Sequence, residues 1–221
     1  MGIKENLRNI RGNINENVTL VAVSKTKPVE DLMIAYDMGQ RDFGENKVQE
    51  LINKVEILPG DIKWHFIGNL QTNKVKYLVG KTYLIHSLSS LKLLRKIEEE
   101  FSKKNTLANL LIQINIGREE TKGGIFEEDL DEFILEVEKC KSIKVRGLMT
   151  IIPKGNTEEN RHYFKKMKSI FDKLSNNLYK NITMEVLSMG MTQDYKIALE
   201  EGSTLVRVGE GIFGKRNIIG G

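Results

Sequence analysis

Short apolar runs alternate along the chain with longer segments in which apolar residues recur every three or four positions. The first run, 20–24, is rich in branched side chains and predicts a buried strand that is closed by Lys25. The segment 29–38 that follows has the spacing of an amphipathic helix. The same succession recurs to the end of the chain, so we expect strands and helices to alternate throughout.

The pattern predicts eight strands, each after the first separated from its predecessor by a helix. The expected strands are 20–24, 42–44, 64–67, 83–86, 107–115, 144–150, 184–187 and 204–208. The expected helices are 3–14, 29–38, 47–57, 71–79, 90–103, 127–141, 158–178 and 192–201.

Uninterrupted alternation of this kind predicts parallel strands covered by helices. Eight such units predict a closed (β/α)₈ TIM barrel, with an open doubly wound sheet as the alternative. We find no linker, internal repeat or low-complexity tract, and we therefore expect one domain over residues 1–221.

The composition changes this picture little. The chain has 221 residues, a net charge of +4, and acidic and basic residues interspersed without a dense basic stripe, so we expect neither nucleic acid nor membranes as partners. One cysteine, Cys140, excludes a disulfide within the chain and fits a reducing compartment. With no membrane-length apolar stretch and no signal-peptide pattern, a cytoplasmic location is expected.

In a TIM barrel the functional residues lie at the C-terminal ends of the strands. Here polar and glycine-rich residues follow the predicted strands, at 25–27, 44–47, 67–71, 86–87, 113–115, 188–192 and 209–211. The last two segments occupy the usual phosphate site of such barrels. Their glycines let backbone amides approach an anion, and Thr192 is placed to cap the next helix. Alternatively, these glycines serve only as turns.

Two cationic side chains are candidates for chemistry. Lys25 shares a strand face with Val21 and Val23, and burial there would lower its pKa and activate the amine toward a carbonyl group. Otherwise Lys25 marks where the strand reaches solvent. Arg207 lies within the last strand and needs an acceptor, which could be a carboxylate such as Glu185 or Glu210, or a ligand atom.

A lysine, two anion-binding loops and an arginine together suggest a phosphorylated carbonyl compound held as a Schiff base. A pyridoxal-phosphate protein and a class I aldolase both fit. His65, His86 and His162 lie on separate elements without metal-ligand spacing, so we expect no metal site. His65 either faces the barrel interior or is a structural histidine.

Six sequence blocks, in order along nearly the whole chain, resemble the YggS/PROSC family of pyridoxal phosphate homeostasis proteins. The blocks are 21–28, 43–50, 64–74, 147–150, 187–192 and 206–214. The resemblance implies a barrel like the N-terminal domain of alanine racemase, with pyridoxal 5'-phosphate as the cofactor.

The resemblance also implies a role for each candidate residue. Lys25 would carry the cofactor as a Schiff base, and Arg207 would face the pyridine nitrogen. The phosphate cradle would comprise Ser188, Gly190, Gly209 and Glu210, and Asn46 and His65 are further candidate contacts. The family often has threonine where this chain has Glu210, so either its backbone N–H alone serves or phosphate affinity is reduced. Lys122, in a loop of the family's pattern, is either a transient acceptor of the cofactor or a solvated lysine.

The resemblance favours a carrier over an enzyme. An arginine at the pyridine nitrogen disfavours protonation of the ring and weakens it as an electron sink. The chain also ends seven residues after Gly214, which leaves no room for the separate domain that supplies the second base of alanine racemases. We therefore expect no catalytic residue, a monomer, and pyridoxal-phosphate-dependent apo-enzymes as partners. An amino-acid racemase is the alternative.

Overall fold

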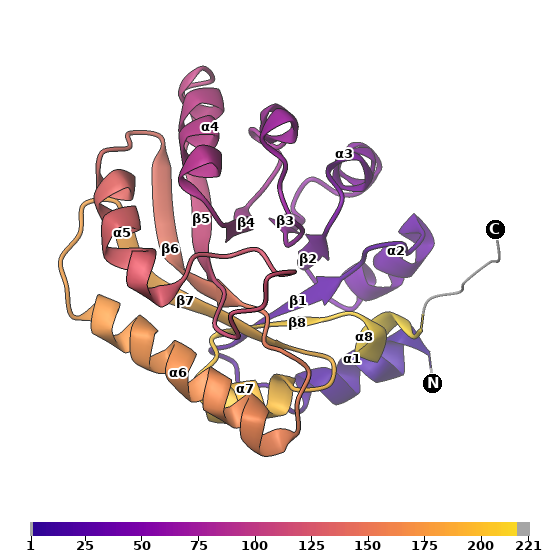
Figure 1. The fold of residues 1–221 in the computed structure, drawn as a ribbon. Helices are drawn as coiled ribbons and strands as arrows, with labels where there is room; N and C mark the ends of the chain where they lie inside the picture. The colour runs from indigo at the N-terminus through magenta and orange to yellow at the C-terminus, as the bar shows by residue number, and fades with distance from the viewer. Residues whose placement is uncertain (1, 216–221) are drawn as a thin grey trace.

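The computed structural model describes residues 2–215 and contains a closed barrel of eight parallel strands in chain order (Figure 1). Each strand pairs in parallel with the next, and β1 pairs with β8 to close the ring. The TIM barrel predicted from the sequence is confirmed, and the alternative of an open doubly wound sheet is wrong. The strands are β1 (Thr19–Val23), β2 (Asp42–Glu45), β3 (Lys63–Phe66), β4 (Leu84–Leu88), β5 (Ala108–Ile114), β6 (Ile143–Thr150), β7 (Ile182–Met191) and β8 (Leu205–Val208).

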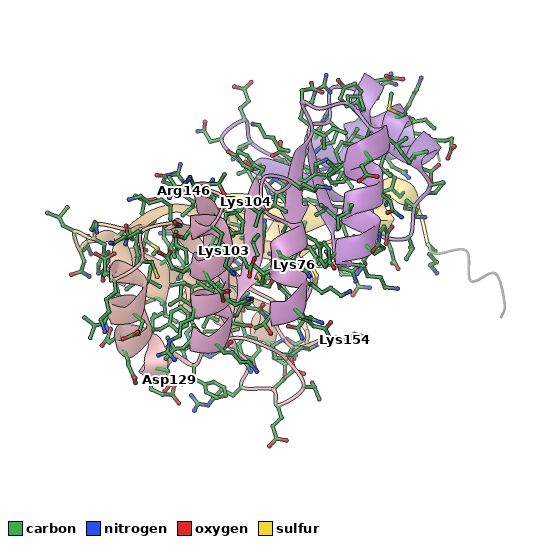
Figure 2. The ribbon with its side chains drawn as sticks, turned by 90° about the horizontal axis from the view of Figure 1, so that it is seen from above. Lys76, Lys103, Lys104, Asp129, Arg146 and Lys154 are labelled. Carbon is green, nitrogen blue, oxygen red and sulfur yellow. The ribbon has the colours of Figure 1, made fainter. Side chains whose placement is uncertain are left out.

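Helical segments surround this ring. They are α1 (Ile3–Arg11), α2 (Val29–Asp37), α3 (Val48–Ile57), η1 (Thr72–Tyr77), α4 (Leu91–Ser102), η2 (Glu127–Asp129), α5 (Leu130–Glu138), α6 (Thr157–Ser175), α7 (Tyr195–Glu200) and α8 (Glu210–Phe213). Seen from above, charged side chains are exposed on the helical layer, such as Lys103 at the end of α4 and Asp129 in η2 (Figure 2). Within residues 2–215, every helix is too short or too polar to cross a lipid bilayer.

The longer helices form for reasons visible in their sequences. In α4 the residues Leu94, Ile97 and Phe101 recur on one face and are buried. Helix α6 begins with a capping box, in which the Asn156 side chain accepts hydrogen bonds from the first turn while Glu159 accepts one from the Asn156 N–H. Each such cap stabilises a helix by about 1 kcal/mol.

Successive strand residues contribute to two different cores. Ala22, Ile85 and Val206 belong to the larger core, which includes the buried side chains of the helices. Alternate strand residues form a second, smaller cluster from five strands. The members of this inner cluster are Val21, Leu84, Leu111, Met149 and Leu205. Because alternation has a period of two, the side chains two positions further along each strand also face the barrel interior.

Several predicted boundaries differ from the structure. The segment 188–191, expected as a loop, belongs to β7, and the helix expected at 192–201 begins only at Tyr195. The segment 71–79 forms a 3₁₀ helix instead of an α-helix, and 127–141 divides into η2 and α5. Helix α8 follows β8 where only a glycine turn was expected. These differences cluster at the C-terminal end of the barrel, where tertiary contacts override local pattern.

Gly147 shows why one strand contains a glycine. It has φ of +147°, and a β-carbon there would lie 1.9 Å from the backbone oxygen of Val186 on the neighbouring strand. The register between β6 and β7 shifts at this point. Gly147 therefore permits a bulge in which the two backbones approach more closely than a side chain allows.

Replacement of Gly147 by alanine is expected to destabilise the fold by about 3 kcal/mol, since it combines an unfavourable φ with a backbone clash. Gly39→Ala isolates the φ contribution, because Gly39 has φ of +83° and open space around it, and should cost about 1 kcal/mol. Gly60→Ala, with neither constraint, is the matched control. Urea unfolding at equilibrium measures all three, and equal losses for Gly39 and Gly147 would contradict the clash.

Candidate functional site

Arg207 lies in β8, two residues after Leu205, and its guanidinium is almost fully buried. Its Nη1 donates to the backbone oxygen of Ser188 at 2.9 Å and to the Ser188 hydroxyl, and its Nη2 donates to the Thr150 oxygen at 2.8 Å. Burial lowers the pKa of Arg207 to about 10, and the Asp194 carboxylate opposes that shift. The guanidinium therefore remains charged at neutral pH and is held by oxygen atoms of β6 and β7.

The ion pair considered for Arg207 in the sequence is not the arrangement observed. Glu185 pairs instead with Arg146, at 3.1 Å between Oε2 and Nη2. Glu210 is exposed on α8, outside the barrel strands. The acceptors for Arg207 are uncharged oxygen atoms of β6 and β7, and not the carboxylate that the sequence suggested.

A continuous set of hydrogen bonds connects Arg207 to the opposite end of the barrel. The Ser188 Oγ lies 3.1 Å from Nδ1 of His86, and Nε2 of His86 lies 2.9 Å from Nδ1 of His65. Nε2 of His65 lies 3.0 Å from Oδ1 of Asp42, at the start of β2. These residues form one hydrogen-bonded chain, Arg207–Ser188–His86–His65–Asp42. It lies in the barrel interior beside the apolar inner cluster.

His86 is fully buried within this chain. Burial lowers its pKa well below the usual 6.5, and the neighbouring His65 and the Arg207 charge lower it further. His86 is therefore neutral at physiological pH. One ring nitrogen then donates and the other accepts, as its two neighbours on either side require.

Lys25 lies two residues beyond Val23, the last residue of β1, and is partly exposed. The residues on both sides of it are held by hydrogen bonds. The Ser24 hydroxyl donates to Glu45 Oε1 at 2.7 Å, and the Thr26 backbone N–H donates to Glu50 Oε1 at 2.6 Å. Thr26 adopts a left-handed φ of 63°, which is unusual for a branched residue. The turn that presents Lys25 is therefore strained and is maintained by two carboxylates.

Lys54 of α3 joins those carboxylates into one cluster. Its Nζ donates to Glu45 Oε1 at 2.6 Å, to Glu50 Oε1 at 2.8 Å and to the Ser24 oxygen at 2.8 Å. The Glu45 and Lys54 side chains are 0% and 7% exposed. Burial raises the pKa of Glu45, and Lys54 and Ser24 partly offset the increase. Glu45 Oε2 is buried without a hydrogen-bond partner among the described residues, so this ion pair is only partly compensated.

The two loops predicted to bind an anion lie together. The backbone N–H of Gly211 points to the Thr192 hydroxyl at 3.4 Å, which joins the chain after β8 to the chain after β7. Thr192 does not cap α7, because Asp194 precedes that helix and accepts from the Met191 N–H at 2.6 Å. Gly190 has φ of +93°, and a β-carbon there would clash with the Tyr195 backbone at 2.9 Å.

Apart from Glu210, which is exposed on α8, the predicted cofactor residues fall into two groups. Lys25, Asn46 and the glycine pair Gly190 and Gly209 lie at or just beyond the C-terminal ends of β1, β2, β7 and β8. Arg207, Ser188 and His65 lie inside the barrel and belong to the hydrogen-bonded chain. Ser188 is fully buried and uses its oxygen for Arg207 and His86, so a contact to phosphate stays a prediction for it. Sequence reasoning missed the parts played by His86, Asp42, Glu45 and Lys54.

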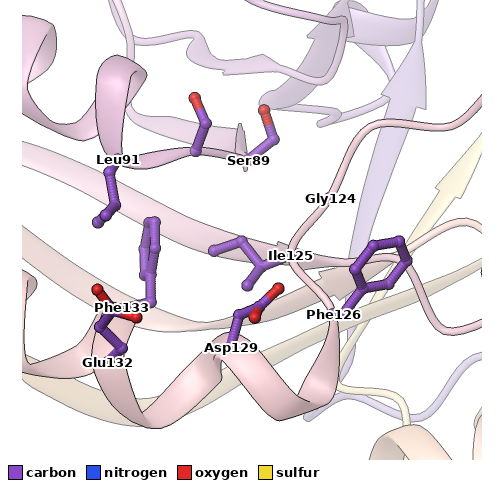
Figure 3. A pocket seen from close by; sticks show the side chains of 9 residues that line it. Ser89, Leu91, Gly124, Ile125, Phe126, Asp129, Glu132 and Phe133 are labelled. Carbon is purple, nitrogen blue, oxygen red and sulfur yellow. The ribbon is translucent and has the colours of Figure 1, made fainter.

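A cavity of about 300 Å³ opens outside the barrel, between the starts of α4 and α5 (Figure 3). Ser89, Gly124 and Phe133 line it, and Asp129 and Glu132 place carboxylates at its border. None of the predicted cofactor residues borders this cavity. Among residues 2–215, no group of three histidine, cysteine or acidic side chains is arranged to hold a metal ion.

Comparison with known proteins gives consistent matches over almost the whole chain. Residues 2–217 match the family model described as alanine racemase, N-terminal domain. The chain is 45% identical over 199 residues to the pyridoxal phosphate homeostasis protein of Aquifex aeolicus, covering 89% of this chain and 86% of that one. It is 42% identical over 204 residues to the protein of that name from Schizosaccharomyces pombe, covering 90% and 85%.

Solved structures agree with this result. PipY of Synechococcus elongatus with PLP bound is 33% identical, with a TM-score of 0.87 over 96% of this chain and 100% of that one. Alanine racemase of Clostridium difficile 630 is 16% identical, with a TM-score of 0.79 over 98% of this chain and 57% of that one. The second likeness shows the fold alone.

We expect acid to destabilise the protein through His86. Its folded-state pKa lies below that of the unfolded chain, so the unfolded chain binds a proton first as the pH falls below about 6.5. The contribution to the free energy of unfolding then decreases by up to about 1.4 kcal/mol per pH unit. Urea unfolding between pH 5 and 7.5 should show a shallower slope for His86→Gln than for the parent. His162→Gln, on an exposed helix face, is the control, and an unchanged slope in His86→Gln would refute the assignment.

Removal of the Lys54 charge should destabilise the protein in a pH-dependent way. Lys54→Met leaves Glu45 buried and unpaired, at an expected cost of about 3 kcal/mol near pH 8. The loss should shrink as the pH is lowered toward 5, because burial raises the pKa of Glu45 and the variant lacks the Lys54 charge that opposes this increase. The double variant Glu45→Gln/Lys54→Met should recover much of the stability at pH 8. Lys168→Met, which breaks an exposed pair with Asp172, is the control with little effect at either pH.

Proposed function

Because this chain belongs to the family of pyridoxal phosphate homeostasis proteins, we propose that it holds pyridoxal 5'-phosphate on Lys25 and buffers or delivers it without robust catalysis. The observation that carries the proposal is that a lysine, a buried guanidinium and two glycine-containing segments lie at the same end of the barrel. β1 pairs with β8, in a register that places Val21 beside Arg207. Lys25 therefore emerges next to the segment that contains Gly209.

The residues at this end fit the three polar parts of the cofactor. A primary amine at Lys25 suits an aldehyde, and when bound the cofactor supplies an electron-withdrawing ring to whatever amine it carries. Backbone N–H groups around Gly190 and Gly209 suit the phosphate, and Thr192 is the hydroxyl that joins the two loops. Arg207 supplies a charged donor for the ring nitrogen.

Glu210 is the residue that departs from the family pattern. Its side chain is exposed, in the first turn of α8. That position supports the first of the two expectations, in which only the backbone N–H of Glu210 serves the phosphate while the carboxylate stays in solvent. The charge then weakens binding only through screened repulsion.

The charge of Arg207 supports a carrier. A guanidinium with a pKa of about 10 donates hydrogen bonds at neutral pH but holds its own proton, so it stabilises an unprotonated ring nitrogen. That arrangement makes the ring a weak electron sink, whereas most chemistry at the α-carbon of an amino acid needs a strong one. Relatives that carry the name of homeostasis proteins support the same choice.

Replacement of Lys25 by alanine should abolish stable retention of the cofactor, because the nearby Lys27 amine is bound to the backbone oxygens of Phe213 and Lys215. Borohydride reduction followed by peptide mass mapping should place the adduct on Lys25 in the parent protein and leave the variant unlabelled. Lys47→Ala, which removes an exposed lysine after the neighbouring strand β2, should retain full labelling. Undiminished labelling of Lys25→Ala at another residue would overturn the assignment.

The loaded parent protein also separates a carrier from a racemase. Chiral chromatography after incubation with a panel of L-amino acids should show no conversion above that of Lys25→Ala. Incubation with a pyridoxal-phosphate-dependent apo-enzyme should restore that enzyme's activity. Conversion of any amino acid by the parent alone would favour the racemase. Absence of a cofactor absorption band after incubation with pyridoxal phosphate would favour a Schiff-base aldolase.

A further inference from the structure

Each of the two groups at the ends of the hydrogen-bonded chain can act only as a donor or only as an acceptor. The Arg207 guanidinium carries only donors, so the Ser188 oxygen must accept from it. The Asp42 carboxylate carries only acceptors, so Nε2 of His65 must donate to it. Three groups lie between these ends, Ser188, His86 and His65, and each could face either way if it stood alone.

If each ring carries a single proton, the two ends determine the position of every proton between them. If His65 donates from Nε2, its Nδ1 is bare and accepts from Nε2–H of His86. The Nδ1 of His86 is then bare and accepts from the Ser188 hydroxyl. All four bonds point from Arg207 toward Asp42, and both histidines carry their proton on Nε2. The hydroxyl proton of Ser188 is thereby directed away from the guanidinium.

The opposite direction conflicts with Arg207. If the protons of both rings moved to Nδ1, His86 would donate to the Ser188 oxygen, and the Ser188 proton would need another acceptor. The guanidinium bonded to that oxygen offers only donors, so it would repel the serine proton. A neutral acceptor at position 42 would keep the direction from Arg207 toward Asp42. An apolar side chain would leave Nε2–H of His65 without an acceptor, so only Arg207 would still favour that direction.

Asp42 is the member of the chain that meets solvent. Its side chain is 20% exposed, against 1% for His65. It borders a hollow of about 530 Å³ at the N-terminal end of the barrel, together with Arg41 and Lys63. The acceptor end of the hydrogen-bonded chain therefore lies at the end of the barrel opposite to Lys25, and its link to the cofactor residues runs through His65.

We propose that Asp42 is a positioning residue for the cofactor site: through His65 and His86 it orients the Ser188 hydroxyl and so holds the Arg207 guanidinium in place. The inference rests on the proposed function for its consequence, because Arg207 is the group that faces the ring nitrogen. The proton arrangement itself holds with or without the cofactor.

Nitrogen-15 NMR of the histidine rings tests the arrangement in protein free of pyridoxal phosphate. The parent should show His65 and His86 protonated on Nε2 alone at pH 7.5. Asp42→Asn, whose amide oxygen still accepts, should retain both signals. Asp42→Leu should lose the pure Nε2–H pattern, because Nε2–H of His65 is then buried without an acceptor and opposes the direction that Arg207 favours. A ring protonated on Nδ1 in the parent, or an unchanged pattern in Asp42→Leu, would overturn the proposal.

The second measurement is the rate at which protein loaded with pyridoxal phosphate releases it to an excess of a scavenging hydrazine. Asp42→Leu should release it roughly tenfold faster, the equivalent of one weakened hydrogen bond to a charged group, and Asp42→Asn at the parent rate. An altered tautomer pattern with unchanged release would refute the connection to the site. If the protein never retains pyridoxal phosphate, the proposed function fails while the ring measurement still decides the arrangement. If Asp42→Leu does not fold, the ring signals of the parent and Asp42→Asn remain decisive.

Discussion

The burial of one guanidinium is the constraint on which the barrel interior depends. A charge enclosed by protein is costly unless its donors meet acceptors, and Arg207 meets the hydroxyl and backbone oxygen of Ser188 and the backbone oxygen of Thr150. The Ser188 hydroxyl can accept from Arg207 only if its own proton has another acceptor. His86 is that acceptor, and His86 in turn is hydrogen-bonded to His65. The chain ends where a carboxylate, Asp42, meets solvent. The hydrogen-bonded chain thus crosses a barrel interior that otherwise contains the apolar inner cluster.

Lys25 depends on a second, separate set of charges. Its neighbours Ser24 and Thr26 are held through Glu45 and Glu50, and Lys54 links the two carboxylates. These contacts maintain a left-handed turn that a branched residue otherwise avoids. The lysine is therefore supported from the helix side of the sheet and Arg207 from its inner side. Because the two sets of contacts are separate, a substitution in one set should change stability independently of a substitution in the other.

The fold was predictable because buried parallel strands read as short apolar runs and their covering helices as periodic ones. The prediction failed where an inward-facing strand is polar. Ser188 and Gly190 look like loop residues, yet they belong to β7. The hydrogen-bonded chain was not predicted because His86 and Ser188 are 102 residues apart in the sequence. The signal that could have found it is the alternation itself, since His86 follows Leu84, and Arg207 follows Leu205, on the same face.

The direction of the hydrogen bonds also bears on how the phosphate would be held. A hydroxyl that gives its proton to His86 and its oxygen to Arg207 has no donor left for an anion, so Ser188 is better suited to the ring end of the cofactor than to the phosphate end. Thr192 directly follows the last residue of β7, and its hydroxyl already meets the Gly211 N–H. It is therefore the hydroxyl that faces the joined loops. In the proposed complex, the barrel interior would orient the ring through side chains. The phosphate would depend mainly on backbone amides, which would tolerate the exposed Glu210 beside them.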